Sequence, residues 1–174
     1  MSDRFAAQIT IGGTIPRSLV EGLCNEISAS GGSTDWGETN CEPSDERSLL
    51  NLRGENGTIT LYDSEARYGE FPELEAFLID HGIPFDRLSE AKWEYDGEVV
   101  KFRPGHELYH LLATQDGETS ITSEEIEEIA KRLDYVDGLS KRELLDLVVQ
   151  VRDDLRSVMG MDVPPVPPLV IVEG

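Results

Sequence analysis

Apolar and polar residues alternate near the start of the chain. Over residues 5–11 the side chains of Phe5, Ala7, Ile9 and Ile11 fall on one side, which predicts a strand with one covered face. Residues 16–30 then carry apolar side chains three and four positions apart and stop at a pair of glycines. This spacing predicts an amphipathic helix that follows the first strand.

Residues 33–36 fit a short strand, and residues 37–48, which are polar and rich in turn-forming residues, are predicted to be a surface loop. Residues 49–53 and 58–62 are predicted to be two strands, joined through Glu55-Asn56-Gly57. A second helix is predicted over residues 71–82, because Pro72 stands in its first turn and Gly82 can adopt the left-handed conformation that ends it.

Residues 91–103 have the pattern of a β-hairpin that turns at Asp96-Gly97. Pairing about that turn places Trp93 opposite Val100 and Ala91 opposite Phe102, on one face of the hairpin. We therefore expect Trp93 to be buried.

The C-terminal region begins with a short apolar segment, 108–114, whose pattern fits a strand or a helix. Two capping boxes follow, each predicting the start of a helix: Thr122 with Glu125, and Ser140 with Glu143. The second helix has a heptad-like apolar stripe too short for a coiled coil, so we expect it to pack on the preceding domain. Four prolines between residues 163 and 168 predict an extended segment, and 169–172 a final edge strand.

The order of predicted elements over residues 1–105 is strand, helix, two strands, helix, two strands. This order predicts an α+β fold, in which an antiparallel or mixed sheet carries two helices on one face. The layout is similar to the ferredoxin-like βαββαβ arrangement. Residues 106–174 are predicted to form a C-terminal hairpin and helical appendage with a proline-rich tail, packed on the first region as one unit.

The strong negative charge of the chain bears on its function. It has 35 Asp and Glu against 15 Lys and Arg, a net charge of −20, and 11 of the basic residues are arginines. Three explanations stand side by side: solubility, adaptation to high salt, or a surface that presents carboxylates to a basic partner in place of nucleic-acid phosphates. Residues 1–105 have 20 acids and 9 bases and residues 106–174 have 15 and 6, so the charge does not form a tail. Direct binding to nucleic acid is disfavoured, because no basic patch offsets the repulsion.

These observations favour a non-enzymatic interaction protein whose partner is another protein, with a basic protein that itself binds nucleic acid as the candidate partner. The acids suspected of binding it cluster between a strand and a helix: Asp63, Glu65, Glu70, Glu73 and Glu75. No secretory signal and no apolar stretch of membrane-spanning length are found, so we expect a cytoplasmic protein without a membrane partner. Cys24 is expected to be a reduced core thiol, since it lies on the apolar face of the first helix.

A second interpretation rests on His106-Glu107-Leu108-Tyr109-His110, which resembles the H-E-x-x-H motif of the zinc metallopeptidases called zincins. On a helix, His106 and His110 would share a face and could bind zinc, with Glu107 as the base toward a zinc-bound water. Arg103-Pro104-Gly105 stand just before the motif and disfavour a helix there. In a strand the two histidines would be about 13 Å apart, too far to bind one ion. A small zinc metallohydrolase is therefore the alternative function, and otherwise no cofactor is expected.

Overall fold

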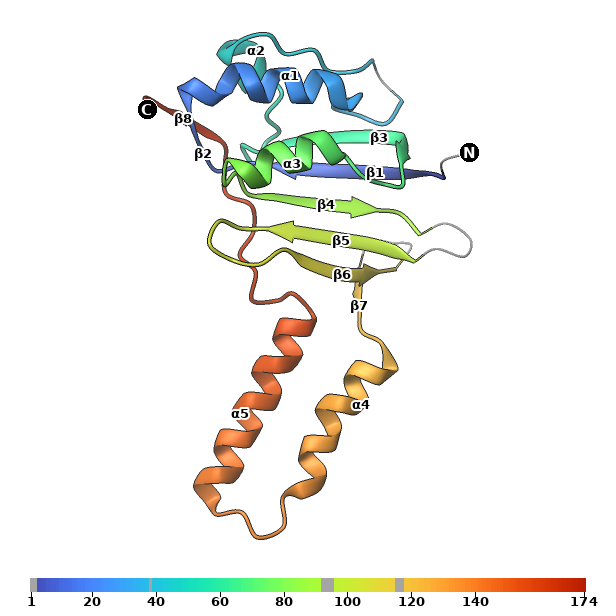
Figure 1. Cartoon of the computed structure of the whole chain (residues 1–174), viewed down its shortest axis with the longest axis vertical. Helices are drawn as coiled ribbons and strands as arrows, with labels where there is room; N and C mark the ends of the chain where they lie inside the picture. The colour runs from blue at the N-terminus through green and yellow to red at the C-terminus, as the bar shows by residue number, and fades with distance from the viewer. Residues whose placement is uncertain (1–2, 38, 92–95, 115–117) are drawn as a thin grey trace.

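The computed structural model of the chain describes residues 3–37, 39–91, 96–114 and 118–174. Its centre is a six-stranded sheet with the order β3-β1-β4-β5-β6-β7, in which all neighbours are antiparallel (Figure 1). The strands are β1 (Arg4–Ile11), β3 (Ile59–Arg67), β4 (Phe85–Ser89), β5 (Gly97–Phe102), β6 (Tyr109–Ala113) and β7 (Thr119–Ser120). The predicted α+β class is confirmed.

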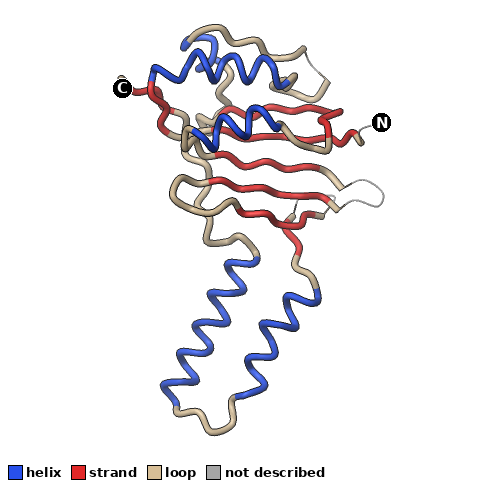
Figure 2. Tube along the Cα trace, in the orientation of Figure 1, coloured by secondary structure: helices blue, strands red, loops and turns tan. Residues whose placement is uncertain are grey.

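Two helices, α1 (Val20–Ser30) and α3 (Pro72–Asp80), lie on one face of this sheet (Figure 2). The alternation predicted for the first strand is observed in β1, where Ile9 and Ile11 are fully buried beneath the helices. Leu23 and Ile27 of α1 and Leu78 of α3 complete the centre of the core. Helix α1 ends at Gly31, whose φ of 76° is the left-handed conformation that glycine adopts without strain.

The finer prediction of a ferredoxin-like layout is not confirmed. Strands β3 and β4 are both antiparallel to β1, which lies between them, so β3-α3-β4 forms one split β-α-β unit. The rest of the sheet, β4 to β7, is a meander of antiparallel neighbours. Beyond β4, each strand therefore pairs with the next strand in the chain. A ferredoxin-like layout would instead have a second split β-α-β unit.

An antiparallel hairpin is present in this region, as predicted, but its register differs from the predicted one. Strand β5 pairs with β4, so Phe102 lies opposite Phe85 and Val100 opposite Arg87. Ala91 lies outside both strands, and the predicted burial of Trp93 falls on a residue outside the described part of the chain. The true first strand was overlooked because its core-facing positions after Phe85 are Arg87 and Ser89, which do not give an apolar alternation.

Residues 49–53 were predicted to be a strand, and this is wrong. Most of them belong to helix α2 (Glu46–Asn51), which begins with a capping box in which Asp45 and Ser48 exchange hydrogen bonds. The two leucines that suggested a strand are instead on a short helix, with Leu49 buried in the core.

The C-terminal region is joined to the sheet at two places. Strands β6 and β7 extend the sheet, and a separate two-stranded parallel sheet joins β8 (Val170–Val172) to β2 (Thr14–Pro16). Between them the chain leaves the sheet as an antiparallel pair of helices, α4 (Ser123–Lys131) and α5 (Lys141–Val158), here called the helical hairpin. Both predicted capping boxes are confirmed at its helix starts.

The helical hairpin projects away from the sheet, so the expectation that its second helix packs on the first domain is wrong (Figure 1). The chain returns to the sheet just after α5 ends: a Cβ placed on Gly160 would lie 2.4 Å from Cδ1 of Leu111, and the Thr119 hydroxyl of β7 lies 3.5 Å from the Met159 carbonyl oxygen. Among the described residues, no helix has the length and apolar character that crossing a bilayer requires.

Residues 163–169, here called the C-terminal strap, return across the ends of the sheet strands. Nε of Arg103 donates to the Pro164 carbonyl at 2.8 Å. The Gly13 N–H donates to the Pro167 carbonyl at 3.0 Å, and the Leu169 N–H donates to the Gly57 carbonyl at 2.9 Å. The strap thereby holds three strand ends together before it continues into β8.

Candidate functional site

The acids predicted to bind a partner are distributed over one side of the sheet. Asp63 and Glu65 lie on β3, which is the terminal strand of the sheet; Glu70 precedes α3, and Glu73 and Glu75 lie in its first turn. Glu65, Glu70 and Glu73 are exposed and Asp63 is partly exposed. Charged side chains on a terminal strand also discourage the pairing of its free edge with another chain.

Glu75 differs from the other four because it belongs to a buried ion pair. Its Oε1 lies 3.0 Å from Nε of Arg87, and it also accepts a 2.9 Å hydrogen bond from the N–H of Phe71. The side chain of Arg87 is 3% exposed and that of Glu75 is 14% exposed. Glu75 is therefore occupied inside the fold, and the partner-binding candidates reduce to Asp63, Glu65, Glu70 and Glu73.

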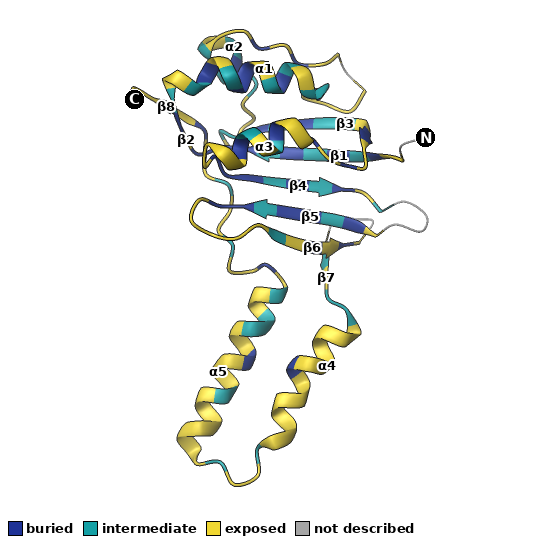
Figure 3. Cartoon of the chain, in the orientation of Figure 1, coloured by how far each residue is buried: buried dark blue, intermediate teal, exposed yellow. Residues whose placement is uncertain are grey.

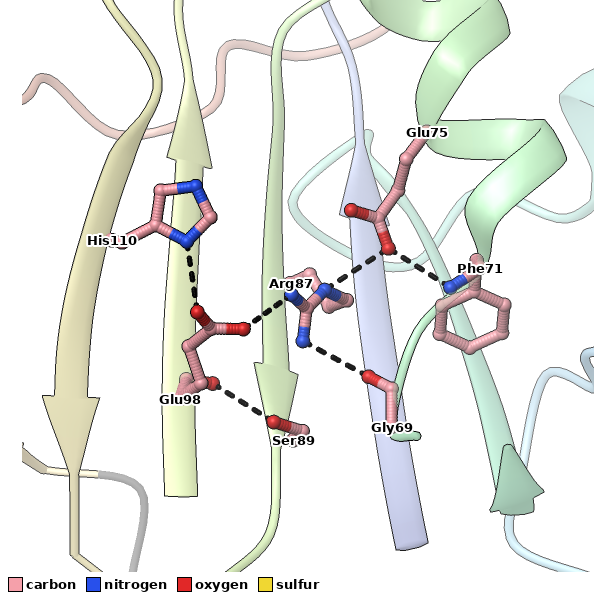
Figure 4. A network of polar contacts seen from close by, with 7 residues as sticks. All are labelled: Gly69, Phe71, Glu75, Arg87, Ser89, Glu98 and His110. Carbon is pink, nitrogen blue, oxygen red and sulfur yellow. Dashed lines mark hydrogen bonds and ion pairs between the residues drawn. The ribbon is translucent and has the colours of Figure 1, made fainter. Parts of the chain in front are cut away.

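Arg87 is the centre of a polar network that crosses the sheet beneath the start of α3 (Figure 4). Its NH1 donates to the Gly69 carbonyl at 3.0 Å, and its NH2 donates to Oε2 of Glu98 on β5 at 2.5 Å. One guanidinium thus connects the loop before α3, the first turn of α3 and strand β5. Neither Arg87 nor Glu98 was predicted from the sequence as a site residue; the β4–β5 register makes them diagonal neighbours, because Glu98 lies opposite Ser89.

Glu98 continues the network to His110 on β6, whose Nδ1 lies 2.8 Å from Glu98 Oε1. Burial raises the pKa of Glu98, but hydrogen bonds from His110 and Arg87 favour its ionised form and leave the pKa below its ordinary value. The side chain of His110 is 57% exposed, so the network reaches solvent at this end. The carboxylates of Glu75 and Glu98 thus neutralise the charge of the buried Arg87 guanidinium.

The structure does not form the helix that the H-E-x-x-H interpretation requires. His106 lies in a turn, where its N–H donates to the Arg103 carbonyl at 3.1 Å, and His110 lies on strand β6. Gly105, with a φ of 81°, makes this turn possible after Pro104 ends strand β5. Within the described residues no group of three or more His, Cys, Asp or Glu side chains is arranged to hold a metal ion.

The negative charge is concentrated in the sheet region, meaning all residues outside the helical hairpin. That region has 25 acids and 9 bases, whereas residues 123–158 have 10 and 6. Two of the nine bases, Arg87 and Arg103, are buried, and Arg103 NH1 lies 2.8 Å from Oδ1 of Asp86. These two arginines neutralise internal carboxylates, so the surface of the sheet region remains strongly negative.

Most residues of the helical hairpin are exposed (Figure 3), and several of the exposed side chains are large and apolar. Ile129 of α4 and Val151 of α5 are buried, and an ion pair joins Arg132 to Asp154. Large apolar side chains nearby remain exposed, and four of them follow the same helical spacing as the buried pair. These four, here called the hairpin stripe, are Ile126, Leu133, Leu144 and Val148.

Comparison with known proteins assigns the chain to no family: no family model matches it, and neither a curated protein nor a solved structure matches it at a significant level.

Proposed function

We propose that this chain is a non-enzymatic, cytoplasmic interaction protein, and that carboxylates of the sheet region bind a basic protein. The single observation that carries the proposal is the excess of 25 acids over 9 bases in that region, with two of the bases buried. Such an excess attracts cationic partners and speeds their association. A basic protein that normally binds nucleic acid fits best, because spaced carboxylates can take the place of phosphates.

The exposed acids Glu65, Glu70 and Glu73 are the best candidates for the contact. They lie on neighbouring segments, the end of β3 and the start of α3, which the buried Arg87–Glu75 pair fixes relative to the sheet. Rigid support lowers the entropy that binding costs, so carboxylates at this position should bind more tightly than carboxylates on a free loop.

A dye-labelled arginine-rich peptide, followed by fluorescence anisotropy, tests the proposal. The variant that combines Glu65→Gln, Glu70→Gln and Glu73→Gln should bind it about tenfold more weakly, since three exposed charge pairs contribute about 0.5 kcal/mol each. The matched control combines Asp134→Asn, Asp137→Asn and Asp146→Asn, which remove the same charge from exposed positions on the helical hairpin.

The control should change the affinity by less than about twofold, and added salt should weaken binding of the wild-type protein because screening shortens the reach of each charge. Equal losses in the two variants would show a diffuse attraction to any acid and would contradict a defined site. Binding that is insensitive to salt would contradict the electrostatic mechanism itself.

A further inference from the structure

The helical hairpin leaves an apolar stripe without a cover. On α4, Ile126 lies three positions before the buried Ile129 and shares its side of the helix. Leu133 lies four positions after Ile129, in the short 3-10 helix η2 (Arg132–Tyr135) that continues α4. On α5, Val148 lies three positions and Leu144 seven positions before the buried Val151, so both share its side of the helix. The four stripe residues are 36–56% exposed. Two helices bury only one line of contact, whereas a helical bundle buries the whole apolar stripe of each helix.

Charged residues border the stripe differently on the two helices. On α4, Glu127 follows Ile126 directly, and Glu124 lies one turn before Glu127. On α5, Arg152 lies one turn beyond Val148, and Arg156 one turn further. Arg152 contacts Asp153, the next residue, at 2.6 Å, and both of these side chains are more than half exposed. Lys131 lies one turn beyond Glu127, and Arg156 contacts Asp162 at 2.8 Å, so the border has an excess of acids along α4 and an excess of arginines along α5.

We propose that a second copy of this chain covers the hairpin stripe, and that α4 of each copy packs against α5 of the other in a symmetric four-helix bundle. A two-fold axis brings the same surface of both copies together, so the acidic border meets the basic border twice. The stripe is thus complementary to itself in charge as well as in apolar character.

The distribution of net charge favours the same location. Two chains that each carry −20 repel one another, and the repulsion is least where the net charge is smallest. With 10 acids and 6 bases, the helical hairpin is far closer to neutrality than the sheet region. A basic partner would prefer the sheet region for the same reason, so the dimer and the proposed partner use separate surfaces.

Sedimentation velocity of the full chain over a wide concentration range tests the proposal. We expect a dimer that Val148→Glu dissociates, raising the dissociation constant at least about tenfold, because the symmetric interface would bury two such charges. Val149→Glu is the matched control: Val149 is 44% exposed and lies about 100° further round α5, away from the stripe. It should leave the dimer intact, and far-UV circular dichroism checks that both variants remain folded.

Exchange of the border charges tests the arrangement of the helices. Glu127→Lys alone and Arg152→Glu alone should each weaken the dimer, because like charges then face each other twice. A mixture of the two variants should form a heterodimer close to the wild type in strength, since both contacts become attractive again. A monomer at every concentration would overturn the proposal and leave a different protein as the occupant. Equal disruption by Val148→Glu and Val149→Glu, or a mixture that stays monomeric, would overturn it as well.

Discussion

Arg87 and Glu75 join the sheet to helix α3 through a buried ion pair, with Nε of Arg87 3.0 Å from Oε1 of Glu75. Neither residue would be stable alone at this depth, because a charge removed from water costs several kcal/mol unless an opposite charge accompanies it. Glu98 and the Gly69 carbonyl bind the other side of the guanidinium. The pair therefore fixes α3, and with it the exposed acids at the start of that helix.

Removal of Glu75 should leave Arg87 with incomplete compensation. We expect Glu75→Ala to lower the free energy of unfolding by about 3 kcal/mol, at the low end for a broken buried pair because Glu98 remains. Glu73→Ala is the matched control, an exposed glutamate of the same helical turn, and should change stability by no more than about 0.5 kcal/mol. Urea unfolding measures both, and coincident midpoints for the two variants would refute a stabilising role for the pair.

The lowered pKa of Glu98 predicts a pH dependence with a definite sign. Its contribution to stability is complete above the pKa that this carboxyl has in the unfolded chain, and is lost as the pH falls through the lower pKa in the folded protein. The capping residues Glu125 and Glu143 also have lowered pKa values, because each accepts hydrogen bonds from its cap residue.

The difference in unfolding free energy between the wild type and Glu98→Gln isolates the contribution of Glu98, since both capping glutamates remain in each protein. We expect this difference to shrink as the pH falls below the ordinary glutamate pKa of 4.5. A difference that grows as the pH falls would contradict the assigned direction of the shift. Urea unfolding at a series of pH values provides the measurement.

The C-terminal strap lies very close to Gly12, which leads to a prediction about what holds the strap in place. A Cβ placed on Gly12 would lie 2.0 Å from the Pro167 carbonyl oxygen, so one side must move. Gly12→Ala should cost about 1–3 kcal/mol and expose the strap to proteolysis. At Gly54 the nearest atom to an added Cβ is 3.9 Å away, so Gly54→Ala should leave proteolysis of the strap unchanged. Equal protection of the strap in both variants would mean that the contact does not hold it.

Structural features that depend only on residues close together in the chain can be predicted from local patterns in the sequence. The alternation in β1 and the Thr122–Glu125 and Ser140–Glu143 capping boxes are examples, since each is complete within a few residues. The Asp45–Ser48 box offered the same kind of signal, but the adjacent leucines were interpreted as a strand.

Contacts between segments that are far apart in the sequence could not be predicted in this way. Arg87 finds its partners on α3 and β5, and nothing beside it in the sequence indicates that a core position of a strand holds an arginine. The same holds for the helical hairpin. The spacing of its apolar residues predicts that one side of each helix is buried, but it does not show which part of the structure buries that side.

The net charge of −20 leads to a last prediction, that added salt stabilises the folded chain. Unpaired carboxylates repel one another most strongly in the compact state, and screening shortens their reach to about 10 Å at 0.1 M salt and about 3 Å at 1 M. Salt also screens attractive ion pairs, such as Arg17 with Glu46, but such exposed pairs contribute little. Because acids outnumber bases 25 to 9 in the sheet region, the relief of repulsion should dominate.

The unfolding temperature should therefore rise with sodium chloride and level off at a few tenths molar, as the screening length falls below the typical spacing of surface charges. The measurement belongs in a Val148→Glu background, so that salt acts on folding and not on the proposed dimer. Combining Glu65→Gln, Glu70→Gln and Glu73→Gln in that background should reduce the rise, since fewer charges remain to be screened. A protein that folds only in molar salt would point to high-salt adaptation. An unfolding temperature that stays constant or falls would show that the carboxylates are already compensated, and would remove the basis for a basic partner.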